Sequence, residues 1–359
     1  MIFVDRTIPL LAQLLSSAGP VELFDHHQVD ATMLARAGCT ALFFRSTLRV
    51  TPALLEGTAV TFLGSVTSGS DHIAPEILAN PQWTVALASG ANANAVAEYV
   101  LTSVLLWCSH NHVDPADLTV GIIGFGNIGR RVAWYMQALG LRVVVNDPPL
   151  VESGFAFPPQ VHVEPLDELL GTCTVITNHV PLTTTGQYPT RGLLGTQQLR
   201  RCPARLIVHT SRGGIIVERA LHDAVRRGIA VAVDVWEREP NISPMLATRA
   251  LLATPHIAGH SANAKTSAAI SIARQYALWR QIRLELPSVA LPRRELFRAD
   301  LTPSLVLKRL LEARCFDRDT DFLRRMAHRP PKQRCAAIEH FRATYPPRYE
   351  VFRTPYDQE

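Results

Sequence analysis

The sequence has little of what marks secreted, membrane-spanning or metal-dependent proteins. Its 359 residues include six cysteines, none of them paired at C-x-x-C spacing, which disfavours both a disulfide framework and a zinc site. We expect small buried thiols in a reducing compartment instead. The six cysteines are Cys39, Cys108, Cys173, Cys202, Cys315 and Cys335.

Long apolar runs and a leader segment are also missing. The longest apolar stretch, from Ala95 to Cys108, is shorter than the ~18 residues of a membrane span, and it contains Glu98. The chain begins Met-Ile-Phe-Val-Asp, which resembles a first β-strand, without the basic segment and cleavage site of a signal peptide. We therefore expect a cytoplasmic protein with no membrane partner.

Clustered metal ligands are scarce as well. The closest approaches to a cluster are His26-His27 and His110-x-His112. Neither is accompanied by further ligands at the spacing typical of a metal site. We expect no metal.

The positive charge of the chain is concentrated near its C-terminal end. Residues 1–287 carry 21 basic and 21 acidic side chains, so the whole formal +5 falls in residues 288–359, which carry 15 basic and 10 acidic ones. Because acids are interleaved with bases, this segment lacks the basic stripe of a nucleic-acid-binding surface. We expect no nucleic-acid partner.

Apolar strand-like runs alternate with helix-period segments through the middle of the chain. The expected strands there are Val120–Ile123, Leu141–Val145, Thr174–Thr177, Leu206–His209 and Ile229–Val233. This alternation predicts an α/β fold with a Rossmann-type, doubly wound parallel sheet. A weaker alternation before residue 92 predicts a smaller, flavodoxin-like α/β lobe.

Four segments follow from these patterns. We expect a first α/β lobe in residues 1–92, the doubly wound domain in residues 93–258, and a helix that returns to the first lobe in residues 259–286. Residues 287–359 are rich in proline and arginine and predict a separate C-terminal α+β extension. Four leucines of this extension predict an apolar face suited to a partner. They are Leu305, Leu307, Leu310 and Leu311.

A glycine-rich segment provides the first functional motif. Gly124-Phe-Gly126-Asn127-Ile128-Gly129 directly follows a predicted strand and opens a predicted helix. Glycines at this spacing permit a tight turn, close approach of a pyrophosphate and close helix–strand packing. Asp147 ends the next strand, 18 residues after Gly129. A carboxylate there accepts hydrogen bonds from ribose hydroxyls and repels a 2′-phosphate, so the motif predicts NAD rather than NADP.

Three polar side chains follow later strands of the same predicted sheet. Arg212 lies in His209-Thr-Ser-Arg-Gly-Gly, Glu239 in Asp234-Val-Trp-Glu-Arg-Glu-Pro, and His256 in Thr254-Pro-His-Ile-Ala-Gly. Ligands of open α/β sheets bind beyond the carboxyl ends of the strands. We therefore expect these three side chains to lie near one another. Glu237 is a rival carboxylate that we expect to face solvent.

These motifs resemble those of the D-isomer-specific 2-hydroxyacid dehydrogenases, from residue 1 to about residue 285. The resemblance implies that His256 is the general base, that Glu239 holds and polarises it, and that Arg212 binds the substrate carboxylate. It also implies a set of cofactor-binding residues. They are Gly124, Gly126, Asn127, Ile128, Gly129, Asp147, Thr177, Thr210, Ser211, Arg212, Asp234 and Gly259.

Within this family the chain resembles the members that act on a phosphorylated four-carbon 2-hydroxy acid in vitamin B6 biosynthesis. The features that they share with this chain are Arg45-Ser-Thr, Thr67-Ser-Gly-Ser-Asp-His, Asp147-Pro-Pro, Gly186-Gln-Tyr-Pro-Thr and the C-terminal extension. Because those members dimerise through the extension, the resemblance implies a homodimer. Ser46, Thr67 and His260 would contact the substrate. We further hypothesise that Arg45 and an extension arginine, Arg348 or Arg342, neutralise its phosphate.

Two alternatives remain open at this stage. The chain could act on another 2-hydroxy acid, such as phosphoglycerate or glyoxylate/hydroxypyruvate, because position 260 is His where the B6-pathway members have Tyr. It could also be an NAD(H)-sensing, co-repressor-like binding protein on the same fold.

Overall fold

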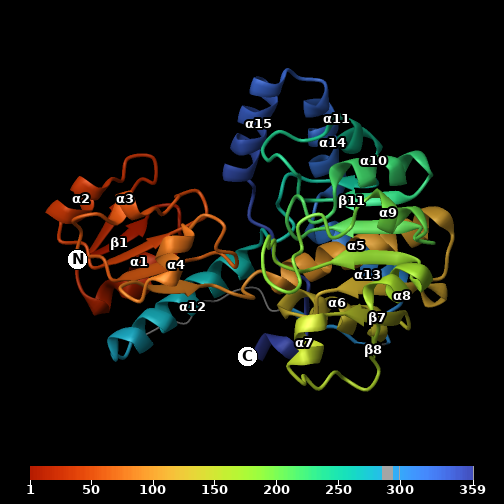
Figure 1. Cartoon of the computed structure of the whole chain (residues 1–359), viewed down its shortest axis with the longest axis horizontal. Helices are drawn as coiled ribbons and strands as arrows, with labels where there is room; N and C mark the ends of the chain where they lie inside the picture. The colour runs from red at the N-terminus through yellow and green to blue at the C-terminus, as the bar shows by residue number, and fades with distance from the viewer. Residues whose placement is uncertain (285–293, 299, 359) are drawn as a thin grey trace. The chain divides into compact units, whose positions relative to one another are not determined.

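The computed structural model describes residues 1–284, 294–298 and 300–358, and its contacts divide the chain into two units. Unit 1 comprises Met1–Asn92 and the segment that begins at Ser261, and unit 2 comprises Ala93–His260 and the segment that begins at Arg294. Figure 1 shows their elements. The expected boundary between residues 286 and 287 lies outside the described residues, and the four-segment division stays a prediction.

Unit 1 is a five-stranded parallel sheet in the order β2-β1-β3-β4-β5, which is the flavodoxin-like order. The first lobe is therefore confirmed as a flavodoxin-like α/β unit. Its strands are β1 (Ile2–Asp5), β2 (Val21–Phe24), β3 (Ala41–Phe44), β4 (Phe62–Ser65) and β5 (Thr84–Leu87). Its helices are α1 (Leu11–Leu15), α2 (Ala31–Arg36), α3 (Pro52–Leu55), α4 (Pro75–Ala79) and α12 (Ala262–Arg280), with a short 3-10 turn at Ser16–Ala18.

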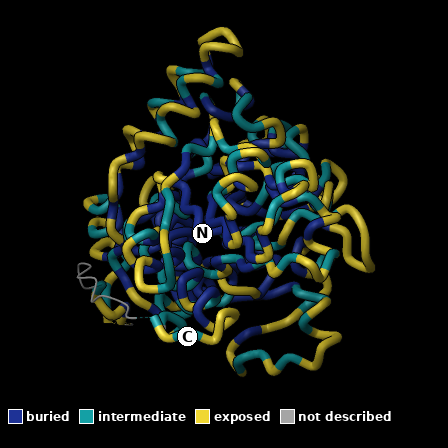
Figure 2. Tube along the Cα trace, turned by 90° about the vertical axis from the view of Figure 1, so that its left-hand side faces the viewer, coloured by how far each residue is buried: buried dark blue, intermediate teal, exposed yellow. Residues whose placement is uncertain are grey.

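The helices of unit 1 cover both faces of its sheet. On one face, α1 and α12 pack over alternate strand residues such as Val4 and Phe43. On the other face, α2, α3 and α4 pack over Phe3 and Phe44, which are next to Val4 and Phe43 in the sequence. Successive strand side chains point to opposite faces, so both must be apolar in a sheet covered on both sides. Figure 2 shows this burial along the chain.

Unit 2 contains a seven-stranded parallel sheet in the order β12-β11-β10-β9-β6-β7-β8. Its core is the Rossmann order, with one more strand at the β12 edge. The predicted doubly wound sheet is confirmed. The strands are β6 (Thr119–Ile123), β7 (Arg142–Asn146), β8 (His162–Val163), β9 (Val175–Asn178), β10 (Leu206–His209), β11 (Ala230–Val233) and β12 (Leu252–Ala253).

Seven helices of unit 2 precede the extension. They are α5 (Ala93–Asn111), α6 (Asn127–Ala138), α7 (Pro148–Glu152), α8 (Leu166–Thr172), α9 (Thr196–Arg200), α10 (Glu218–Arg226) and α11 (Pro244–Arg249). A short 3-10 turn, Pro115–Asp117, precedes β6. Among the described residues, no helix is both long and apolar enough to cross a membrane.

The C-terminal extension, meaning the described residues from Arg294 onward, packs on unit 2 rather than standing apart from it. It contains β13 (Glu295–Leu296), α13 (Pro303–Ala313), α14 (Phe316–Ala327), α15 (Pro331–Ala343) and β14 (Phe352–Arg353), with a last 3-10 turn at Pro355–Gln358. The two short strands pair in parallel, so the α+β character is confirmed. Helix α13 packs on α5, and α14 packs on α11 and β12.

This packing corrects the expected partner face of the extension. Leu307 and Leu310 are buried in the core that α5 and α6 share with the sheet, and Leu311 packs against the same core. Only Leu305, at 38% exposed, remains a large exposed apolar side chain of the four. The apolar stripe is therefore used mostly within the chain, because α13 covers the outer side of α5.

The six cysteines are all free. Cys39, Cys108, Cys173 and Cys202 are buried as expected, and burial raises the pKa of Cys39 to about 12. The expectation is wrong for Cys315, which is exposed, and for Cys335, which is half-buried.

Candidate active site

The glycine-rich segment forms the expected strand–turn–helix. Strand β6 ends at Ile123, Gly124 adopts a φ of 92°, and α6 begins at Asn127, followed by Ile128. A Cβ on Gly129 would lie 2.0 Å from the carbonyl oxygen of Gly124, so helix and turn touch through backbone. A Cβ on Gly126 would meet nothing within 4 Å. That open space at a helix N-terminus fits a pyrophosphate.

Asp147 directly follows β7, and its side chain binds the glycine-rich turn. Its Oδ2 accepts a hydrogen bond from the Phe125 N–H at 2.7 Å, and its Oδ1 accepts one from the Leu150 N–H at 3.1 Å. The carboxylate therefore caps α7 and is held beside the glycine turn. This is the position from which it can accept hydrogen bonds from a ribose.

The proposed general base and its partner are in contact. Nδ1 of His256 lies 2.8 Å from Oε2 of Glu239, and the two side chains are 34% and 23% exposed. Oε1 of Glu239 accepts the Trp236 N–H at 3.0 Å, which fixes the carboxylate. Burial alone would raise the pKa of Glu239, but His256, the Trp236 N–H and Arg342 together hold that pKa below its usual value.

An arginine from the extension lies beside the carboxylate of this pair. Nη1 of Arg342, on α15, lies 3.8 Å from the same Oε2 of Glu239. The hypothesis from sequence named Arg342 as one of two arginines near the substrate. The structure places it at the carboxylate that holds His256.

Arg212 lies on the loop that follows β10. Its Nη1 donates to the Ser211 carbonyl at 2.9 Å. A Cβ on the next residue, Gly213, would lie 1.9 Å from the Trp236 carbonyl oxygen. The loop of Arg212 therefore touches the loop of Glu239 backbone to backbone, and only glycine fits between them.

The loop of His256 is held by Asp234, the first residue after β11. The Asp234 carboxylate accepts the N–H groups of Ile257 at 2.8 Å and Ala258 at 2.9 Å, and the Thr254 hydroxyl at 2.6 Å. Asp234 and Gly259 were expected to line the cofactor site. That role stays a prediction, and the structure adds a second role for Asp234 in shaping the loop.

Buried histidines surround the ends of β9 and β10, and reasoning from sequence missed their importance. Nδ1 of His209 lies 3.2 Å from the Asn178 amide nitrogen, and Nε2 of His179 lies 3.0 Å from the Thr177 hydroxyl. Burial lowers the pKa of both imidazoles to about 3, so both are neutral at physiological pH. Ser211 also hydrogen-bonds Asn178, and Thr210 is buried beside it.

The candidate substrate residues of unit 1 follow β3 and β4. Arg45 donates to the Thr7 hydroxyl at 3.3 Å, and Ser46 is exposed. The Thr67 hydroxyl lies 2.7 Å from that of Ser65, which also contacts Nε2 of His72 at 2.9 Å. Ser65 was not singled out from the sequence, because it lies inside an apolar strand.

Arg348 lies elsewhere than the phosphate hypothesis required. It is 7% exposed, donates to the Ala258 carbonyl at 2.8 Å and lies 3.8 Å from Oε2 of Glu98. A buried guanidinium bonded to backbone is not available to bind a phosphate, so we withdraw Arg348 as a substrate contact. His260 lies beside Tyr345, with the ring centres 6.0 Å apart.

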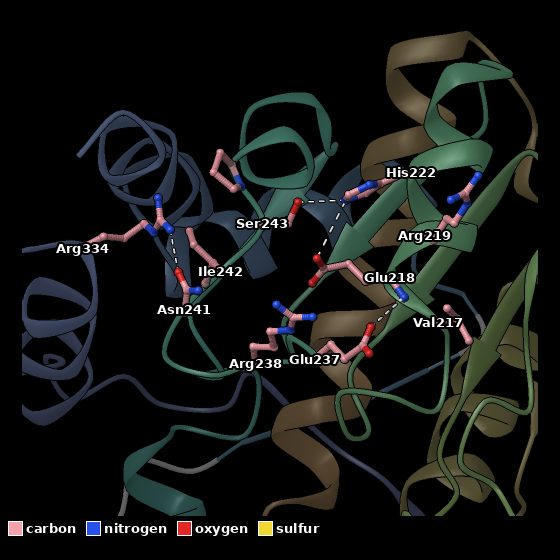
Figure 3. A pocket seen from close by; sticks show the side chains of 11 residues that line it. Val217, Glu218, Arg219, His222, Glu237, Arg238, Asn241, Ile242, Ser243 and Arg334 are labelled. Carbon is pink, nitrogen blue, oxygen red and sulfur yellow. Dashed lines mark hydrogen bonds and ion pairs between the residues drawn. The ribbon is translucent and has the colours of Figure 1, made fainter. Parts of the chain in front are cut away.

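Glu237 lines a hollow of about 500 Å³ (Figure 3). As expected, its side chain is exposed, and its carboxylate accepts the Glu218 N–H at 3.2 Å. The hollow also contains His222, hydrogen-bonded to Ser243 at 2.9 Å, and arginines from three segments. Neither Glu239 nor His256 lines it.

One cluster in unit 1 was underestimated from the sequence. Within the described residues, Asp25, His26 and His27 bring three groups able to bind a metal within 4.8 Å of one another. The carboxylate of Asp25 had not been included with the two histidines. Exposed clusters of this kind are common without an ion, and the absence of a metal site stays a prediction.

Comparison with known proteins agrees with this geometry. Residues 93–258 match the family described as D-isomer specific 2-hydroxyacid dehydrogenase, NAD binding domain. The erythronate-4-phosphate dehydrogenase of Pseudomonas paraeruginosa is 34% identical over 98% of this chain and 93% of its own length. That of Baumannia cicadellinicola is 37% identical over 77% of this chain and 73% of its own length.

Solved structures share the fold. The NAD+-bound 3-phosphoglycerate dehydrogenase of Entamoeba histolytica superimposes with a TM-score of 0.65 at 23% identity, covering 78% of this chain and 95% of that one. The D-lactate dehydrogenase of Aquifex aeolicus, solved with NAD and lactic acid, gives 0.61 at 21% identity, with the same two coverages. The chain belongs to the D-isomer specific 2-hydroxyacid dehydrogenases, as an NAD-dependent oxidoreductase of the erythronate-4-phosphate dehydrogenase family.

Proposed function

We propose that this protein oxidises 4-phospho-D-erythronate to (R)-3-hydroxy-2-oxo-4-phosphobutanoate with NAD, as a step of vitamin B6 biosynthesis in the cytoplasm. The observation that carries the proposal is the His256–Glu239 pair, 2.8 Å apart, beyond the carboxyl ends of the NAD-domain strands. The relatives that share most of the chain's length carry the corresponding name.

His256 accepts the proton of the substrate hydroxyl. Because its Nδ1 faces the Glu239 carboxylate, that nitrogen carries the proton of the neutral ring, and Nε2 keeps the lone pair that can take the hydroxyl proton. Nε2 of His256 takes the O–H proton, and NAD, when bound, would supply the acceptor for the C2 hydrogen as a hydride, so that C2 becomes a ketone. Glu239 stabilises the imidazolium that results.

The other groups orient the substrate. Arg212 presents a planar fork suited to the substrate carboxylate, which directs C2 for hydride transfer. Arg45, Ser46, Thr67 and His260 keep the substrate-binding roles that the resemblance implies. Arg342 replaces Arg348 as the extension arginine near the reacting groups, because it is half-buried at the Glu239 carboxylate.

We also propose a homodimer formed through the extension. The large apolar side chains that the extension leaves exposed support this, since Leu296 is 51%, Tyr349 44% and Leu305 38% exposed. Light scattering of the full chain tests the proposal. A monomer at micromolar concentration would contradict it.

The test of function is NADH formation by the purified protein with 4-phospho-D-erythronate, 3-phosphoglycerate and glycerate. We expect the highest kcat/KM for the phosphorylated four-carbon acid. A preference for phosphoglycerate would move the protein to another branch of the family. NAD binding without turnover of any acid would favour the co-repressor-like alternative.

A further inference from the structure

Two arginines of the extension bind the backbone of the loop that carries His256. Arg348 donates to the Ala258 carbonyl at 2.8 Å. Arg314 donates to the same carbonyl at 3.2 Å and to the Ile257 carbonyl at 3.0 Å. These are the two residues that directly follow His256.

The same two residues are held from their other side. Their N–H groups both bind the Asp234 carboxylate, at 2.8 and 2.9 Å. The N–H groups of Ile257 and Ala258 thus donate to the Asp234 carboxylate, and their carbonyl oxygens accept hydrogen bonds from the two guanidiniums. Such charge-assisted hydrogen bonds are about twice as strong as neutral ones, so the loop is fixed from both sides.

His256 needs this support because of its backbone. Its φ is 57°, in the left-handed region that favours glycine. A non-glycine residue keeps that conformation only where its surroundings over-determine it. The N–H of His256 donates to the Asp234 carbonyl at 2.7 Å, which fixes only the entry to the loop.

Both arginines are themselves held rigidly in the interior. The Arg314 guanidinium lies 5.0 Å from the ring centre of Tyr99 and 4.7 Å from that of Phe316. Arg348 lies 3.8 Å from Glu98 of α5, whose Oε1 also accepts the N–H groups of Val351 and Phe352 at 2.8 Å each. Burial lowers the pKa of Arg348 to about 10, which leaves it charged at neutral pH.

We propose that Arg314 and Arg348 are positioning residues, through which the extension fixes His256 in its catalytic conformation. The proposal rests on the proposed role of His256 as base. Both guanidiniums are buried and bonded to backbone, so they act on the orientation of the imidazole and not by contact with the substrate. Losing them should reduce kcat and leave the affinity for NAD unchanged.

Arg348→Ala, Arg348→Lys and Arg314→Lys in the full chain test this, with Arg353→Ala as the matched control. Arg353 lies five residues after Arg348, and its side chain is exposed. We expect kcat to fall about tenfold to a hundredfold in the first three variants, since a displacement of about 1 Å can have this effect. The KM for the acid and the Kd for NAD should stay within about twofold of wild type.

Chemical rescue separates positioning from general loss of structure. Millimolar guanidinium should restore part of the kcat of Arg348→Ala, and equal concentrations of ammonium should not, because only guanidinium can reproduce the planar fork. Unchanged kcat in Arg348→Ala and Arg314→Lys would overturn the proposal. So would an equal fall in kcat for Arg353→Ala.

A second readout is independent of substrate and of whether Arg348→Ala folds. Amide hydrogen exchange of the segment 254–260 in the NAD-bound protein should be at least tenfold faster in Arg348→Lys than in wild type, and unchanged in Arg353→Ala. Equal exchange in Arg348→Lys and wild type would overturn the proposal even if the protein acts on another acid. Wild-type inactivity on every acid tested would instead contradict the proposed function alone.

Discussion

Oε2 of Glu239 lies 2.8 Å from Nδ1 of His256 and 3.8 Å from Nη1 of Arg342, so one carboxylate oxygen contacts both the imidazole of the proposed general base and a guanidinium of the extension. The imidazole belongs to the loop after β12, and the guanidinium to α15. Both members of the His256–Glu239 pair therefore come from the nucleotide-binding domain, and the extension adds a guanidinium beside their carboxylate.

His256→Gln should remove the proton acceptor and leave the cofactor site intact. We expect kcat to fall by about 10² to 10⁴, the usual contribution of a general base, with the Kd for NAD unchanged. Steady-state kinetics and titration of NAD by protein fluorescence measure the two quantities. A variant with wild-type kcat would exclude His256 as the base.

Glu239→Gln should also lower kcat, because a neutral amide does not stabilise the imidazolium. Since Glu239 acts through His256, we expect the double variant with His256→Gln to be no slower than His256→Gln alone. Glu237→Gln is the control, because its exposed carboxylate lines the hollow in Figure 3, which neither Glu239 nor His256 lines. Additive losses in the double variant would mean that the two residues act separately.

Two neighbouring glycines should respond differently to alanine. Gly129→Ala places a Cβ 2.0 Å from the Gly124 carbonyl oxygen, so the backbone must move and we expect a loss of stability of roughly 2 kcal/mol or more. Gly126→Ala meets nothing within 4 Å. We expect it to fold normally and to bind NAD more weakly, because the methyl group occupies the space for the pyrophosphate.

Urea unfolding and NAD titration of both variants separate these effects. Gly126→Ala with wild-type NAD affinity would show that the cofactor phosphates do not approach that turn. Gly129→Ala with wild-type stability would show that the close helix–turn contact is not needed for folding.

His209 should make the protein sensitive to mild acid. Its pKa is about 3 in the folded protein against 6.5 when unfolded, because burial disfavours the charged form. Between these two pKa values the unfolded chain therefore binds one proton more than the folded chain. The contribution of the buried neutral ring to the free energy of unfolding is fully present above about pH 6.5 and is lost as the pH falls toward 3. His179 behaves in the same way.

His209→Asn should reduce this acid sensitivity by up to one proton. The free energy of unfolding would then fall less steeply below pH 6.5, by up to about 1.4 kcal/mol per pH unit. Urea unfolding between pH 7 and pH 4 measures the slope. An unchanged slope would mean that His209 is protonated in the folded protein.

Much of the fold, and the contact between Glu239 and His256, could be predicted because the signals are local. Fully apolar runs alternating with helical segments around Gly124–Gly129 predicted the doubly wound sheet, and the residues after these runs included Arg212, Glu239 and His256. The strands that the sequence did not predict are short or exposed. Strand β2 (Val21–Phe24) contains a glutamate and is only partly buried. Strands β8 and β12 have two residues each.

Other relationships could not be predicted, because nothing local marks them. Arg348 looks like one of many arginines in a basic segment, and only the tertiary fold buries it on Ala258, ninety residues earlier in the chain. The same holds for Leu307 and Leu310, whose apolar stripe would suit a second chain as well as it suits α5. Spacing along the sequence says which face a side chain lies on, and not what covers that face.

The hydrogen bond between Arg348 and Ala258 also bears on the order in which the enzyme becomes active during its synthesis. The ribosome produces the His256 loop well before it produces the guanidinium that binds the loop. A nascent chain that has released only the two sheets thus holds its base on an unsupported segment. Full turnover would be reached only when the extension has emerged and packed, so an incomplete translation product would bind NAD and oxidise its substrate more slowly than the complete chain.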